Sequence, residues 1–237
     1  MSAIFKREFK SFFTTPLGYV ILMIFNAFGG IYFWFGTLRS GTVEMSYVFS
    51  NFTLVILAAM PVLTMRLFSE ERRQKTDQAL LTAPVSLVGI VSAKFLAAFL
   101  LYIISISSTL IYSVIVANLV AVSFDFWAYV LGSYLGLVLF GAAFIAIGIL
   151  ISSMTENQIV AAILTYAVMI LLLTLGDIAN MLPLPFLASA LYWLSFETKY
   201  NAFVSGVVSL DNILFFISVT VVCLFMTTRV LEKRRWS

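Results

Sequence analysis

Residues 129–151 read YVLGSYLGLVLFGAAFIAIGILI, an unbroken run that contains no Asp, Glu, Lys or Arg. An α-helix rises about 1.5 Å per residue, so a run of about 20 residues covers the roughly 30 Å hydrocarbon core of a bilayer. Five other runs are also apolar and free of charged side chains: residues 17–35, 48–65, 95–117, 158–175 and 213–228. The sequence therefore predicts an all-α membrane protein with six transmembrane helices.

The overall composition indicates the same class. Of the 237 residues, 62% are hydrophobic and 11% are charged, whereas a soluble domain carries about 25% charged residues. The chain has no His, so the commonest catalytic base and metal ligand are missing, and its single Cys223 has no partner for a disulfide. We expect no catalytic residue, no metal and no cofactor bound by this chain, and hence no enzyme.

The basic residues define the orientation. Six spans place the N-terminus, the second and fourth loops and the C-terminus on one side of the membrane. That side receives 12 of the 14 Lys and Arg residues, and the other side receives only Arg39 and Lys199. Because Lys and Arg concentrate in cytoplasmic flanks, both termini are predicted to be cytoplasmic. The net charge of +3 then reflects topology, and nucleic acid is not an expected partner.

Two segments outside the spans are predicted to lie along the membrane. Residues 1–16 form one, since Phe5, Phe9, Phe12 and Phe13 share one helical face while Lys6, Arg7 and Lys10 group on another. The external residues 176–212 form the second. Pro183 and Pro185 interrupt them, and the apolar stretch 186–196 is too short to cross, which favours a re-entrant or interfacial helix over a plain aromatic belt.

The most charged loop, residues 66–94, contains SEERRQKTDQALLT at positions 69–82. Ser69 can cap a helix with Glu70 and Glu71 in its first turn, and this helix must end before Pro84. A coupling helix at about residues 69–83 is thus predicted. A solvated positive-inside loop explains the pattern equally well.

This loop resembles the coupling-helix signature of ABC-2 type exporter permeases, an acidic-acidic-basic triplet followed by Gly-Thr-x-Glu-x-Leu-Leu-x-x-Pro. The matching residues are Glu70-Glu71-Arg72, then Thr76, Leu80-Leu81 and Pro84, while Lys75 replaces the Gly and Gln78 the Glu. Similarity extends over nearly the whole chain. It includes residues 6–9 with Pro16, the blocks 132–136 and 141–144, the segment 152–161 and the end 230–232, and it is closest to the gliding-motility (GldF-like) branch.

The resemblance implies a bacterial inner-membrane permease that works as a dimer with a second copy or a paralogue. A separate ABC ATPase would bind the ATP and Mg, since this chain has no P-loop motif, and an auxiliary membrane protein is a further expected partner. Contacts with the ATPase are implied for Glu70, Glu71, Arg72, Thr76, Gln78, Leu80 and Leu81.

Other polar and small residues within the spans have two interpretations each. Ser105, Thr109 and Ser113 either line a transport pathway or bond the carbonyls of their own helix. Gly132 and Gly136 form a G-x-x-x-G pattern, which fits close packing within the chain or a dimer seam.

Two other functions remain open. One is a membrane subunit that does not transport but anchors an ATPase or signals to it. The other is a secondary transporter, which spans without ionisable groups make difficult to build.

Cysteine labelling tests the topology. In a Cys223→Ser background, cysteines at Gln74 and Ser237 should resist an impermeant thiol reagent in intact cells, because both positions are predicted to be cytoplasmic. Cysteines at Ser40 and Ser209 should react. Labelling of position 237 from outside would contradict the six-span arrangement.

Overall fold

The computed structural model describes residues 2–42, 44–75, 86–120 and 123–235. Every regular element in these ranges is helical, and no strand occurs among them. Six helices or pairs of consecutive helices are long and apolar enough to cross a membrane. The predicted all-α fold with six spans is therefore confirmed.

Three spans consist of two consecutive helices, and three are single helices. The first three are α2 (Pro16–Phe33) with the π-helix η1 (Trp34–Leu38), α3 (Ser46–Thr64) with α4 (Arg66–Arg73), and α6 (Leu87–Ile106) with α7 (Ser108–Leu119). The last three are α8 (Phe124–Met154), α9 (Gln158–Met181) and α12 (Leu210–Arg235). Within the described ranges, three helices lie outside the spans: α1 (Ser2–Thr14), α10 (Pro185–Leu194) and α11 (Phe196–Val204).

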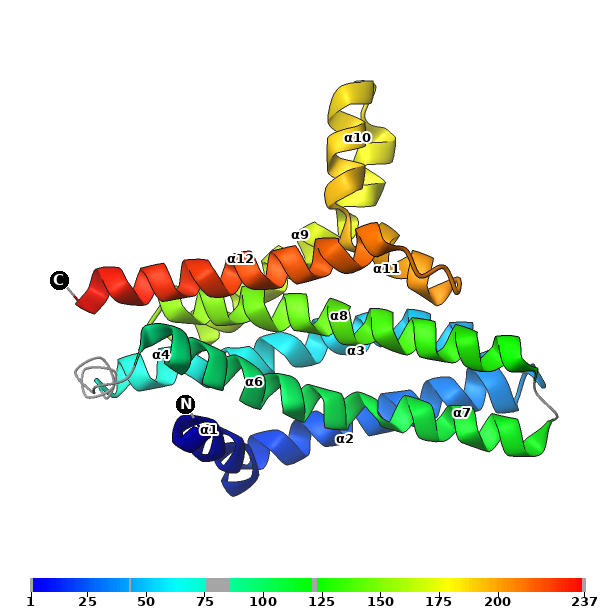
Figure 1. The fold of residues 1–237 in the computed structure, drawn as a ribbon, viewed down its shortest axis with the longest axis horizontal. Coiled ribbons are helices and arrows are strands. Elements are labelled where there is room, and N and C mark those ends of the chain that lie inside the picture. Colours follow the sequence, from blue (N-terminus) through cyan, green and yellow to red (C-terminus); the bar gives the residue numbers. More distant parts are fainter. Residues whose placement is uncertain (1, 43, 76–85, 121–122, 236–237) are drawn as a thin grey trace.

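The spans run side by side, and both chain ends lie at the same end of the bundle (Figure 1). The basic flanks predict that this end is cytoplasmic. Helix α8 is the centre of the bundle, since 72% of its most apolar stretch is buried, against 17% for α12. The apolar side chains that α12 leaves uncovered are suited to contact with lipid.

The third span begins earlier than predicted. Ser86 caps α6 by accepting a hydrogen bond from the backbone amide of Gly89 at 3.2 Å, so the helix starts at Leu87 and not at residue 95. Lys94 consequently lies two turns inside this helix, with only 1% of its surface exposed. The predicted run 95–117 contains no charged residue, but the observed helix is longer than this run and includes a buried lysine.

Helix α1 occupies most of the predicted segment 1–16. Its aromatic face is packed: the rings of Phe5 and Phe9 stack 6.0 Å apart, and Phe13 meets Phe9 at 5.3 Å. Phe12 is buried in the core. Pro16 then occupies the first turn of α2, where its missing N–H costs nothing. The interfacial position of α1 remains a prediction.

The external segment contains two helices of opposite character. In α11, Phe196, Tyr200 and Phe203 are buried, and the Tyr200 hydroxyl donates a hydrogen bond to the carbonyl of Phe49 on α3 at 2.7 Å. In α10 no residue is buried, and Figure 1 shows this helix standing away from the bundle. Helix α11 is therefore anchored in the core of the bundle, whereas no residue of α10 is buried within the chain.

Close approach of helices to α8 depends on its glycines. Gly136 lies directly against Phe203 of α11, and Gly132 faces Val208, whose methyl group would lie 3.0 Å from an added Cβ. Gly141 faces the ring of Tyr102 on α6. The hydroxyl of Tyr102 donates to the carbonyl of Leu137 at 2.7 Å, which fixes the ring over the glycine.

This packing predicts that Gly141→Ala destabilises the protein by about 1–3 kcal/mol, because the new Cβ would overlap the Tyr102 ring. Gly30→Ala is the matched control, since its Cβ would meet only the Tyr112 hydroxyl at 3.6 Å. Thermal unfolding of both variants in detergent measures the difference. Equal stability would show that Tyr102 moves aside without cost.

Candidate coupling site at the cytoplasmic end

Helix α4 continues the second span after a break in the helical backbone. Pro61 lies inside α3, where it removes one backbone hydrogen bond, and α3 ends at Thr64. After Met65 the chain re-enters a helix at Arg66 and leaves it after Arg73. Lys75 then adopts a left-handed conformation with φ of 56°, which marks the end of the helix.

Two predictions about this segment need correction. Ser69 does not cap a helix, since it is buried inside α4 and its hydroxyl donates to the carbonyl of Met65. The predicted helix at 69–83 is not continuous, because α4 begins at Arg66 and ends at Arg73. Thr76, Gln78, Leu80 and Leu81 lie outside the described residues.

A buried ammonium group joins α4 to two other helices. The Nζ atom of Lys94 on α6 lies 2.9 Å from a carboxylate oxygen of Glu71 on α4 and 3.3 Å from one of Glu8 on α1. It also donates to the carbonyl of Leu67 at 2.7 Å. Arg7 lies 2.8 Å from Glu8 and 3.1 Å from Glu71, so two cations balance two carboxylates.

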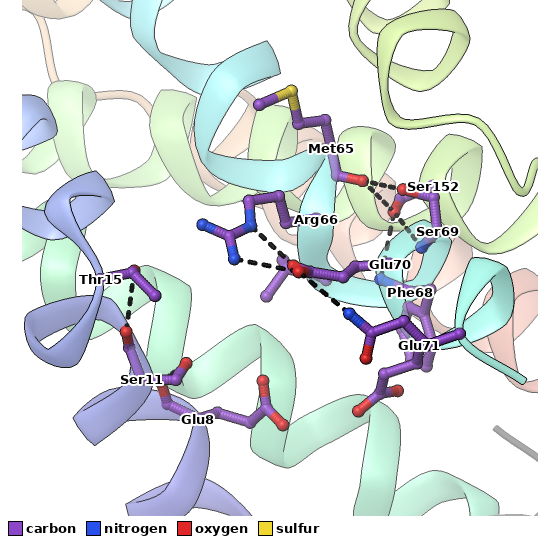
Figure 2. A network of polar contacts seen from close by, with 12 residues as sticks. Glu8, Ser11, Thr15, Met65, Arg66, Phe68, Ser69, Glu70, Glu71 and Ser152 are labelled. Carbon is purple, nitrogen blue, oxygen red and sulfur yellow. Dashed lines mark hydrogen bonds and ion pairs between the residues drawn. The ribbon is translucent and has the colours of Figure 1, made fainter. Parts of the chain in front are cut away.

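Figure 2 shows Glu8 and Glu71 reaching toward one another from α1 and α4. These groups and their neighbours line a cavity of about 390 Å³ between the two helices. Removing one member of a buried ion pair costs about 3–5 kcal/mol, because the remaining charge loses both its partner and its water. The network therefore fixes where α1 and α4 meet α6.

Ser152 of α8 holds the first turn of α4. Its Oγ accepts hydrogen bonds from the backbone amides of Phe68 and Ser69, both at 3.2 Å, and donates to the carbonyl of Met65 at 3.0 Å (Figure 2). The first amides of a helix lack partners within the helix. Here the hydroxyl of Ser152 on the central helix α8 supplies an acceptor for two of the amides, so α4 is capped by a residue from another helix.

Further pairs hold the exposed side of α4. Arg66 binds Glu70 through two hydrogen bonds of 2.7 and 3.1 Å (Figure 2). Arg72 donates to the carbonyl of Met154 at 2.9 Å and pairs with Glu156 at 2.8 Å, in the turn between α8 and α9. Helix α4 is therefore joined to α1, α6 and the α8–α9 turn.

The remaining predicted residues lie elsewhere in the bundle. Ser105, Thr109 and Ser113 are fully buried, and each donates to a carbonyl three or four residues earlier, at 2.8, 2.8 and 2.9 Å. Their role in lining a pathway stays a prediction. Gly132 and Gly136 pack within the chain, as described above.

Sequence reasoning missed the residues that complete this site: Arg7, Glu8, Lys94, Ser152 and Glu156. The available signal for Lys94 was Ser86, a good N-cap directly before an apolar stretch, which would have placed Lys94 inside the helix. No pattern within the sequence marks Ser152, because its partners are 83 and 84 positions away.

Replacing Lys94 tests the network. We expect Lys94→Met to destabilise the protein by about 3 kcal/mol or more, because Glu8 and Glu71 would keep their charges without the central cation. The triple variant Glu8→Gln/Glu71→Gln/Lys94→Met should regain much of that loss. Denaturant unfolding in detergent measures both.

The matched control is Arg229→Met. Arg229 pairs with Glu232 at 2.7 Å, but the two side chains are 60% and 48% exposed, and such pairs contribute under about 1 kcal/mol. If Lys94→Met lowers the free energy of unfolding as little as Arg229→Met does, the buried network does not hold the helices together.

Comparison with known proteins agrees with this architecture. Residues 6–172 match the model of the family described as ABC-2 family transporter protein. The match does not support the narrower gliding-motility branch, and a search of curated proteins found no match. Because the matched residues make up more than half of the 237, the chain belongs to the ABC-2 transporter family, as a transmembrane permease component of an ABC transporter.

Proposed function

We propose that this chain is the permease subunit of an ATP-driven exporter in the bacterial inner membrane, working as a dimer with a separately encoded ATPase. The observation that carries the proposal is the fastening of α4 to α1, α6 and the α8–α9 turn. Any force applied to this helix would reach three parts of the bundle together.

The position of α4 in the chain supports this role. Thr76, Leu80 and Leu81, which match the coupling motif, follow soon after α4 in the sequence, together with Gln78 at the position of the motif's Glu. We propose that these residues contact the ATPase while Glu71 and Arg72 act within the chain. The carboxylate of Glu71 faces Lys94 and its side chain is only 19% exposed, which favours an anchoring role over a contact with a partner.

The positions of the buried charged side chains favour an energy source outside this chain. Among the described residues, the buried charged side chains are Glu8 and Lys94, and both lie in the cytoplasmic network. Proton- or ion-coupled transporters instead place ionisable groups near the bilayer midplane. A partner that hydrolyses ATP on Mg would supply the energy.

Copurification tests the contact. A tagged chain should bring down a protein that is labelled by 8-azido-ATP. We expect Leu81→Asp to reduce its amount about tenfold or more, because losing an apolar anchor costs about 2 kcal/mol. Arg73→Ala, an exposed position on α4, is the control and should have little effect. Unchanged recovery with Leu81→Asp would exclude this segment as the contact.

A second measurement distinguishes a transporter from a passive anchor. In a Cys223→Ser background, a cysteine at the exposed Ser50, at the opposite end of the bundle, is labelled in nanodiscs with and without Mg-ATP. The labelling rate should change several-fold with nucleotide, and Arg72→Ala should suppress that change while leaving the ATPase bound. A labelling rate that does not change with nucleotide would favour the alternative function, a membrane subunit that anchors the ATPase without transporting.

A further inference from the structure

A cleft opens at the end of the bundle opposite the chain termini. It has a volume of about 880 Å³, and its walls come from the start of α3, the start of α8 and the end of α11. Figure 1 places the start of α8 and α11 together at this end. The lining residues come from three segments that lie far apart in the sequence, so the cleft exists only in the folded protein.

The charge of the cleft is negative. Glu44 and Asp125 line it, and its lining contains no Lys or Arg. Within the described part of the chain, neither carboxylate takes part in a salt bridge. The two basic residues of this side lie over aromatic rings, Arg39 over Phe35 and Lys199 over Trp193. The cleft thus offers two carboxylates to a cation from outside the chain.

The hydrogen-bonding groups of the cleft point to a ligand as well. Tyr129 lines it, and its hydroxyl oxygen is buried, makes no hydrogen bond of ordinary geometry in the described structure and lies near the hydroxyls of Ser46 and Ser133. Its ring packs against Gly206, whose φ of 80° and lack of a Cβ allow the approach. A buried hydroxyl without a partner is uncommon in proteins. Ser46, Asn201 and Ser205 add further polar groups to the walls.

A bare metal ion does not fit this arrangement. Among the described residues, no group of three or more acidic or Cys side chains converges on one point, and a volume of this size suits an organic molecule. Phe126 and Tyr129 supply aromatic surface beside the carboxylates, a combination that binds organic ammonium groups. Phe124, which stands between the lining residues Ser123 and Asp125 in the sequence, is an exposed apolar side chain with 86% of its surface accessible.

We propose that this cleft binds an organic ammonium group carried by an amphiphile, with its charge between Glu44 and Asp125 and its tail in the outer leaflet. The proposal concerns binding alone. It requires neither nucleotide nor ATPase, so it can hold or fail independently of the proposed export function.

The test uses the purified full-length chain in maltoside micelles and a fluorescent alkylammonium, N-dansyl-1,10-diaminodecane. Octylammonium should displace this probe, whereas octanol and octanoate should not. Glu44→Gln/Asp125→Asn should weaken probe binding about tenfold or more, because each carboxylate offers a charge-assisted hydrogen bond. Tyr129→Phe should weaken it several-fold with little loss of stability, since the hydroxyl makes no hydrogen bond of ordinary geometry among the described residues.

The matched control is Asp177→Asn/Asp211→Asn, which removes two exposed charges that do not line the cleft and should leave probe affinity unchanged. Displacement by phosphatidylethanolamine but not phosphatidylglycerol would identify a lipid head group as the source, and displacement by octylammonium alone would identify a free amphiphile. Equal probe affinity in the wild type and the Glu44→Gln/Asp125→Asn variant, or equal competition by octanol, overturns the proposal.

Discussion

An ammonium group that leaves water on folding must recover its lost hydration from polar neighbours, and Lys94 recovers it from three directions. Its partners are Glu8 on α1, Glu71 on α4 and the carbonyl of Leu67. These partners lie on α1 and α4, while Lys94 itself lies on α6. Pairing this one charge therefore brings the N-terminal helix and the second and third spans together. The arrangement of the cytoplasmic end depends on this requirement.

The central helix α8 provides the rigid side of the same assembly. Ser152 near its cytoplasmic end holds the amides of α4, and Gly141 allows Tyr102 of the third span to lie against its backbone. Gly136 does the same for Phe203 of α11. A close-packed interior transmits displacement because it is hardly compressible. In the proposed exporter, a movement of α4 would therefore reach α8 and, through it, the external helices.

The two ends of the bundle use charge in different ways. At the cytoplasmic end, the charges of Arg7, Glu8, Glu71 and Lys94 compensate one another inside the protein. At the external end, Glu44 and Asp125 face a cleft whose lining has no compensating cation. The first arrangement fixes helices in place, and the second leaves electrostatic attraction available for a ligand.

The sequence by itself determined the six spans and predicted their orientation, because apolar length and the distribution of Lys and Arg are local properties that act on each segment separately. It also indicated the family, through the motif around Glu70 and Leu81. Local patterns were less reliable for helix ends: Ser69 suited a cap in sequence, but the preceding residues Arg66–Phe68 were already helical. Only the tertiary structure decided that Lys94 is buried, that Ser152 caps α4 and that Glu44 and Asp125 share a cleft. Each of these depends on residues distant in sequence meeting at one point, and the energy of burying or pairing a polar group depends on those neighbours.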